Sequence, residues 1–244
     1  MRILVVVAHP DDEMQCSGTI ALQAAAGMEV TLAVACNGNL GGIPEVDKAE
    51  RSRIRHAEMA AACDVLGAKL QWLDFGDDDF MEHVHSRYSD TEMAFRNLVR
   101  RTRPDLMLVP ALHDYHQHHR AAAELALNAS NNAGNPAIVS EEPASSGIPI
   151  ALHMAPLPGG VFTPDLYVDI TPVFERKLQA MRCHVSQHQY LQEHHRTNIL
   201  EQIEATAVLH GVACGVKYAE AFSLCRQFNR PAPIQKLAPF FPPT

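Results

Sequence analysis

The alternation of apolar and polar positions predicts strands and helices in turn along most of the chain. Runs of branched apolar residues are typical of buried strands, and they occur at residues 3–7, 29–35, 70–75, 105–109 and 165–170. Between them, apolar residues recur at helical spacing, which predicts helices at residues 14–27, 47–66, 94–103, 117–129, 172–184 and 196–210. Strands that alternate with helices indicate parallel βαβ units with right-handed crossovers. We therefore expect an α/β fold with a Rossmann-like, mostly parallel sheet flanked by helices.

Three irregular segments are expected between and after these elements. Residues 36–42 form a glycine-rich loop that could line a pocket, although they lack the Gly-x-Gly-x-x-Gly dinucleotide pattern. Residues 128–147 are expected to form the longest loop, whose length does not require a domain boundary. The final residues, rich in proline and phenylalanine, are expected to form a tail packed on the surface. With 244 residues, 47% of them hydrophobic, the chain is expected to be one domain over residues 1–244.

Ionisable side chains surround the end of the first predicted strand. Pro10 ends this strand because proline has no N–H to donate, and next to it are His9, Asp11, Asp12 and Glu13. Ligands bind at the carboxyl ends of strands in open α/β sheets. Four ionisable groups at the end of a buried strand are costly unless something pairs with them, as a divalent metal would. Glu13 alone could be explained by the preference of acidic residues for helix N-termini.

A second cluster of histidines follows the fourth predicted strand, which also stops at a proline. The chain has 14 histidines, and residues 113–119 contain His113, His116, His118 and His119 beside Asp114. If His9, Asp12 and one of these histidines converge, they form a two-histidine, one-carboxylate set with open positions, which is typical of a catalytic zinc. Adjacent residues usually point in different directions, so Asp11 could reach a water whose pKa zinc lowers to about 7 and act as a general base. We therefore expect a metal site at the C-terminal ends of the strands.

Composition argues against several other classes of protein. A formal net charge of −8 and an isoelectric point near 5.9 provide no basic stripe, so we expect no nucleic-acid binding. The six cysteines are scattered without a Cys-x-x-Cys motif, which predicts reduced, mostly buried thiols in a cytoplasmic protein. The sequence opens on a strand rather than on a signal segment, and no apolar run approaches the length of a membrane span.

Several motifs together point to one known family. They are Ala-His-Pro-Asp-Asp-Glu at residues 8–13, Asp-Tyr-His-Gln-His-His at 114–119, Arg-His-Ala-Glu at 55–58, and the segments 164–171, 184–187 and 218–222. This set resembles the LmbE-like/PIG-L family of zinc-dependent N-acetylglucosaminyl de-N-acetylases and covers nearly the whole chain. The first motif, at the end of its strand, is the most specific, and the second resembles the family's Asp-x-His-x-Asp-His.

The resemblance implies hydrolysis of an N-acyl group on an amino sugar or a similar small molecule. The implied cofactor is Zn²⁺, with other divalent transition metals open, and its implied ligands are His9, Asp12 and His119. Asp11 would be the general base for the attacking water, while His116 would stabilise the oxyanion, protonate the leaving amine, or both. The resemblance also implies that Arg55 contacts substrate hydroxyl groups and that the protein forms a homo-oligomer.

The second motif departs from the family's pattern at one position. His118 stands where the family usually has an aspartate that orients the neighbouring histidine. A carboxylate in that place fixes the tautomer of the histidine and raises its basicity. Asp114 could orient His116 in its place, or His118 could itself contact the metal.

Competing interpretations of these residues remain open. Arg55 and Glu58 could simply form an i,i+3 pair on a helix, and the three aspartates at 77–79 are more typical of an exposed turn than of a second metal site. His184 and Gln187 are expected to position the backbone near the site, and His194 and His195 to be solvated. The alternative functions are a Rossmann-like protein that binds a metal or nucleotide without turnover and, less favoured, phosphoryl transfer with Asp11 as nucleophile. A purely structural metal site needs no free carboxylate beside its ligands, so Asp11 favours the hydrolase.

Overall fold

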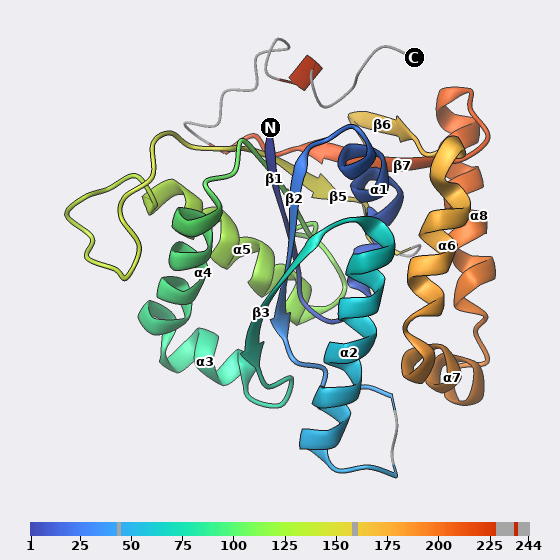
Figure 1. The fold of residues 1–244 in the computed structure, drawn as a ribbon, viewed down its shortest axis with the longest axis horizontal. Helices are drawn as coiled ribbons and strands as arrows, with labels where there is room; N and C mark the ends of the chain where they lie inside the picture. The colour runs from blue at the N-terminus through green and yellow to red at the C-terminus, as the bar shows by residue number, and fades with distance from the viewer. Residues whose placement is uncertain (43–44, 158–160, 228–236, 239–244) are drawn as a thin grey trace.

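The computed structural model describes residues 1–42, 45–157, 161–227 and 237–238, and a seven-stranded sheet runs through its centre (Figure 1). The strands are β1 (Arg2–Val7), β2 (Glu29–Cys36), β3 (Lys69–Phe75), β4 (Leu106–Val109), β5 (Ile150–Met154), β6 (Leu166–Asp169) and β7 (Ala219–Leu224). Their order across the sheet is β3-β2-β1-β4-β5-β7-β6. The first five in this order are parallel, and β7 runs antiparallel to both of its neighbours. The expected α/β fold with a mostly parallel sheet is confirmed.

Helices cover both faces of the sheet (Figure 1). One side carries α1 (Ser17–Ala25), α2 (Lys48–Leu66), α6 (Phe174–Arg182) and α8 (Ile199–Cys214), with α7 (Val185–His194) at the end of this layer. The other side carries α3 (Phe80–Ser86), α4 (Tyr88–Thr102) and α5 (Gln117–Asn132). Successive side chains of a strand point to opposite faces, so Ile3, Val5 and Val7 pack in the first layer and Leu4 and Val6 in the second. None of the helices in the described ranges is long and apolar enough to cross a bilayer.

Several boundaries follow from local chemistry, and others differ from the prediction. Asp47 caps α2 by accepting a hydrogen bond from the Glu50 N–H, and Gly67 ends the helix in the left-handed conformation that glycine adopts easily. The helix predicted at 14–27 is divided into a short 3₁₀ helix, η1 (Asp12–Gln15), and α1. Helix α4 starts well before residue 94, and α5 continues past 129 to Asn132, which shortens the long loop.

Four elements were not predicted: α3, α7, β5 and β7. The strands β5 and β7 are short and contain His153 and Glu220, which interrupt the apolar runs. A second 3₁₀ helix, η2 (Thr171–Val173), precedes α6, so that helix starts at Phe174 rather than at 172. The surface tail expected at the end of the chain falls almost entirely outside the described residues.

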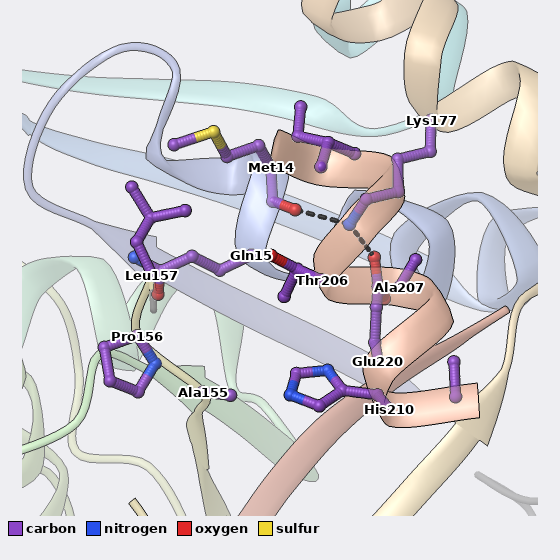
Figure 2. A pocket seen from close by; sticks show the side chains of 12 residues that line it. Met14, Gln15, Ala155, Pro156, Leu157, Lys177, Thr206, Ala207, His210 and Glu220 are labelled. Atoms are coloured by element: carbon purple, nitrogen blue, oxygen red, sulfur yellow. Dashed lines mark hydrogen bonds and ion pairs between the residues drawn. The ribbon is translucent and has the colours of Figure 1, made fainter. Parts of the chain in front are cut away.

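A buried ion pair fastens β7 to the segment that follows β1. The Glu220 carboxylate on β7 accepts hydrogen bonds from the Gly18 and Thr19 N–H groups and from the Thr19 hydroxyl at the start of α1. Lys177 of α6 donates to Glu220 Oε1 and to the Met14 carbonyl, both at 2.5 Å, and Figure 2 shows these two bonds beside a small cavity. These contacts satisfy a buried carboxylate and hold η1 and α1 in place at the end of β1.

Candidate metal and catalytic site

The ends of β1 and β4 bring both predicted clusters to one edge of the sheet. These strands are parallel neighbours, with Ile3 opposite Leu106 and Val5 opposite Leu108. The residues that follow them open onto a cavity of about 670 Å³. All six residues predicted for the site line it, namely His9, Asp11, Asp12, Arg55, His116 and His119.

The Asp12 carboxylate lies between two histidines. Its Oδ2 is 3.3 Å from His9 Nδ1 and 3.2 Å from His119 Nε2, and it accepts a hydrogen bond from the His9 N–H at 2.7 Å. Ligand atoms around a tetrahedral zinc stand about 3.3 Å apart, given bond lengths near 2.0–2.2 Å. The donor types suit a zinc ion, and the two distances from Asp12 to the histidines match the spacing of zinc ligands. Nitrogen atoms of His9, His116 and His119 all lie within 4.8 Å of one another, so these three histidines form a group that could hold a metal without the Asp12 carboxylate.

The Asp114 carboxylate contacts His119 at the ring nitrogen opposite the one that faces Asp12. Its Oδ2 lies 3.1 Å from His119 Nδ1, and its side chain is fully buried. A carboxylate behind a metal-binding histidine fixes the ring's tautomer and orientation. The other oxygen, Oδ1, accepts a hydrogen bond from the His116 N–H at 2.8 Å. Asp114 thus contacts the ring of His119 and only the backbone of His116.

His118 contacts His9 through its ring and His116 through its backbone. Its Nδ1 is 2.9 Å from His9 Nε2, and its N–H donates to His116 Nδ1 at 3.2 Å. When His9 Nδ1 faces a metal, the ring proton is on Nε2 and is donated to His118. His118 stands where the family usually has an aspartate, but its ring contacts the ring of His9 rather than the ring of His116.

The carboxylates of the site favour positive charge between them. Burial by itself lowers the pKa of His119, but Asp12 and Asp114 on either side raise it to about 10. Burial by itself raises the pKa of Asp12, but His119 and His9 hold it well below its usual range. Burial, together with the neighbouring histidines, lowers the pKa of His116 and of His118 to about 4. A site that attracts a proton in this way also attracts a divalent cation, which displaces the proton.

Asp11 lies beside Arg55 and lines the same cavity as Asp12. Its φ of 107° places the backbone in a region that non-glycine residues rarely adopt, and its Oδ2 lies 3.2 Å from an Arg55 nitrogen. Burial raises the pKa of Asp11 to about 6, although Arg55 opposes the shift. A residue held in such a sparsely populated backbone region costs about 1–3 kcal/mol, and its surroundings must keep it there. Here the surroundings are Arg55 and Glu13, whose carboxylate accepts a hydrogen bond from the Asp11 N–H.

Arg55 is buried against the glycine-rich loop. Its guanidinium donates to the Pro10 carbonyl and pairs with Asp11, so it braces the end of β1. A Cβ atom on Gly41 would stand 2.0 Å from Arg55 Nη1, and one on Gly38 would stand 2.7 Å from Arg55 Cδ. A larger residue at either position would therefore have to displace the Arg55 side chain.

Two acidic residues around the site, Glu58 and Asp77, support neighbouring backbone segments. Glu58 accepts hydrogen bonds from the backbone N–H and the hydroxyl of Ser186 rather than pairing with Arg55. Asp77 accepts from the Gly38 and Leu40 N–H groups, so it supports the glycine-rich loop. Residues 77–79 form a turn and are in none of the His, Cys, Asp and Glu groups in the described ranges that could hold a metal.

Sequence reasoning missed a buried pair between Glu13 and His184. His184 Nε2 donates to Glu13 Oε1 at 2.8 Å, and the two side chains are 0% and 1% exposed. Burial by itself lowers the pKa of His184, but Glu13 raises it above its ordinary value. The pair ties η1 to the start of α7, whose Gln187 and Tyr190 line the cavity. The motif at 184–187 pointed to His184 in the sequence, but it did not identify Glu13 as its partner. His195 is exposed as expected and also lines the cavity.

Comparison with known proteins establishes the family. The sequence model of PIG-L, described as GlcNAc-PI de-N-acetylase, matches residues 4–130, which is more than half of the chain. This protein belongs to the PIG-L family. The match spans the segment that contains both clusters of the site, and the resemblance suggested by the motifs is thereby confirmed.

Relatives of this PIG-L protein include enzymes of two reaction classes. Diacetylchitobiose deacetylase from Thermococcus kodakarensis is 30% identical over 194 residues, which are 76% of this chain and 70% of that protein. The 4-oxalmesaconate hydratase from Pseudomonas putida is 27% identical over 213 residues, 83% of this chain and 80% of that protein. The crystal structure of a 4-carboxy-2-hydroxymuconate hydratase from Pseudomonas putida KT2440 superimposes with a TM-score of 0.78 at 25% identity, covering 95% of this chain and 100% of that one. The family thus contains hydratases beside deacetylases.

Proposed function

We propose that this PIG-L protein is a zinc-dependent hydrolase that removes the acetyl group from a small N-acetylated amino sugar. The observation that carries the proposal is the Asp12 carboxylate, which lies between His9 and His119, with Asp11 next to it in the same cavity. His9, Asp12 and His119 would hold the ion. When bound, zinc supplies Lewis acidity to a substrate carbonyl and makes a water more acidic. The family match and the deacetylase relative support the same reaction class.

Asp11 is suited to accept the proton of the attacking water. Its carboxylate lines the cavity while Asp12 is engaged by two histidines, so the two aspartates can serve separate tasks. Arg55 and the Glu13 contact to the Asp11 N–H keep this carboxylate in position. The water oxygen adds to the amide carbon, the C–N bond breaks, and the proton held by Asp11 passes to the departing amine.

His116 is suited to donate a hydrogen bond to the oxygen of the tetrahedral intermediate. Because its Nδ1 accepts the His118 N–H, the proton of the neutral ring is on Nε2. A preorganised N–H donor at this place stabilises negative charge that develops on the former carbonyl oxygen. This assignment favours oxyanion stabilisation over proton delivery to the amine.

The charge of the cavity favours an uncharged substrate. Among the described residues that line it, Arg55 is the only arginine or lysine, and it is already paired with Asp11. Asp11, Asp12 and Asp77 are negative, whereas Leu40 and Tyr190 add apolar surface. Apart from the zinc ion itself, the described lining offers no unpaired arginine or lysine to a carboxylic acid of the kind named for the hydratase relatives. A neutral acetamido sugar needs none, so deacetylation is preferred over hydration.

The proposal is tested with zinc-loaded protein and two substrate sets. N-acetylglucosamine and N,N′-diacetylchitobiose are assayed for release of free amine and acetate, and unsaturated di- and tricarboxylic acids for loss of ultraviolet absorbance. We expect amine release that Asp11→Asn abolishes without loss of zinc, while Asp64→Asn, an exposed aspartate on α2, behaves as the wild type. Hydration of the acids without amine release would overturn the proposal in favour of the hydratase reaction.

A further inference from the structure

A second group of ligand atoms lies on the far side of His9. The Sγ of Cys36 and nitrogen atoms of His9 and His118 all lie within 4.8 Å of one another. His9 Nε2 stands 2.9 Å from His118 Nδ1, whereas His9 Nδ1 faces Asp12. Cys36 is 0% exposed and His118 7% exposed. The ring of His9 therefore stands between two donor sets, one that contains a carboxylate and one that contains a thiol.

The parallel sheet places Cys36 beside His9. Val7 of β1 is opposite Val34 of β2, so two residues further along each strand lead to His9 and Cys36. The Cys36 N–H donates to the Ala8 carbonyl at 2.7 Å, which continues the pairing of the two strands to this point. These backbone contacts hold the thiol next to the imidazole.

His118 completes the group from the first turn of α5. The ring of Phe80 packs edge-on against it at 5.5 Å between centroids, which limits where the imidazole can turn. His9 and His118 both line the cavity, while Cys36 does not. An ion that enters the cavity therefore meets the two imidazoles first and the thiol behind them.

We propose that His9, Cys36 and His118 form a second metal position, which takes a thiophilic divalent ion such as Zn²⁺ or Cd²⁺. A thiolate with imidazoles is a donor set that such ions prefer over magnesium or calcium. The position shares the His9 ring with the Asp12 position and uses the opposite nitrogen. Binding removes one proton from the Cys36 thiol and one from His9 Nε2, and the two negative charges that remain balance the charge of the ion. A neutral set is what a buried site requires.

Cobalt titration of the metal-free protein provides the test. We expect two equivalents of Co²⁺ to bind, the second with a thiolate-to-cobalt charge-transfer band in the near ultraviolet and release of about two protons. Cys36→Ser should keep the first equivalent and lose both the band and the second equivalent. His118→Asn should lose the second equivalent as well. Because His118 is in α5, this variant tests the position even if serine at residue 36 disturbs strand β2. Cys63→Ser, a buried cysteine of α2 outside the group, should retain both equivalents.

Three results would overturn the second position. One is saturation at a single equivalent without a thiolate band. Another is a band that survives Cys36→Ser, and the third is a band that disappears in Cys214→Ser, because that thiol is exposed and lies in α8. Asp12→Asn separates this proposal from the hydrolase. It should weaken the Asp12 position and abolish amine release, while the charge-transfer band remains.

Discussion

Replacing Asp114 by asparagine should weaken zinc binding by about 10–100-fold, because Asp114 orients the proposed ligand His119. Its two oxygens serve different partners, with Oδ2 3.1 Å from His119 Nδ1 and Oδ1 2.8 Å from the His116 nitrogen. Asparagine retains one oxygen acceptor and loses the negative charge. It can therefore hold the His116 backbone or the His119 ring, but not both. The 10–100-fold loss corresponds to about 1.4–2.7 kcal/mol of binding free energy.

The measurement is a zinc competition titration against a chromophoric chelator at fixed pH. Asp114→Asn should fall at the weaker end of this range and Asp114→Ala at the stronger end, because alanine removes both acceptors. Asp64→Asn is the matched control for loss of one negative charge, and thermal unfolding of each metal-free variant checks that the fold is intact. If the zinc affinity of Asp114→Ala stays within twofold of the wild type, the carboxylate does not orient a zinc ligand, and the assignment of His119 fails with it.

Three further changes test other parts of the site and its support. His118→Asp should tighten zinc binding about tenfold, because a carboxylate accepts the His9 Nε2–H more strongly than a neutral ring does. An unchanged zinc affinity in the chelator titration would refute this prediction. Lys177→Met should lower the free energy of unfolding in urea by about 3–5 kcal/mol, since it leaves the Glu220 charge buried and unpaired. Lys69→Met, in an exposed pair, should leave the free energy of unfolding nearly unchanged, and equal losses in the two variants would contradict the argument. Gly41→Ala should displace Arg55 and lower kcat up to about 100-fold with zinc retained. Gly27→Ala, which strains a backbone with φ of 78° but has open space around it, should lower stability and leave kcat unchanged; a full rate in Gly41→Ala would show that the Arg55 contact to Asp11 is dispensable.

Much of the fold could be predicted because its signals are local. Strand β1 is marked by its apolar run and the proline after it, and helix α2 by its caps Asp47 and Gly67. Each of these features acts over a few residues, and both elements formed where they predict them. The short strands β5 and β7 were missed because a polar residue interrupts each of them. Glu220 is buried only because Lys177, Gly18 and Thr19 satisfy its carboxylate. Those partners are far away in the sequence.

By itself, the sequence determined which residues stand at the ends of β1 and β4, and therefore the kind of chemistry available at that edge of the sheet. Only the tertiary structure decided which atoms meet. Glu13, which the preference of acidic residues for helix N-termini could have explained, is paired with His184, 171 residues later. His118 contacts His9 rather than the ring of His116, and Cys36, one of six scattered cysteines, stands beside the same His9. Strand register and the packing of α5 and α7 set these distances, and neither can be derived from the spacing of residues along the chain.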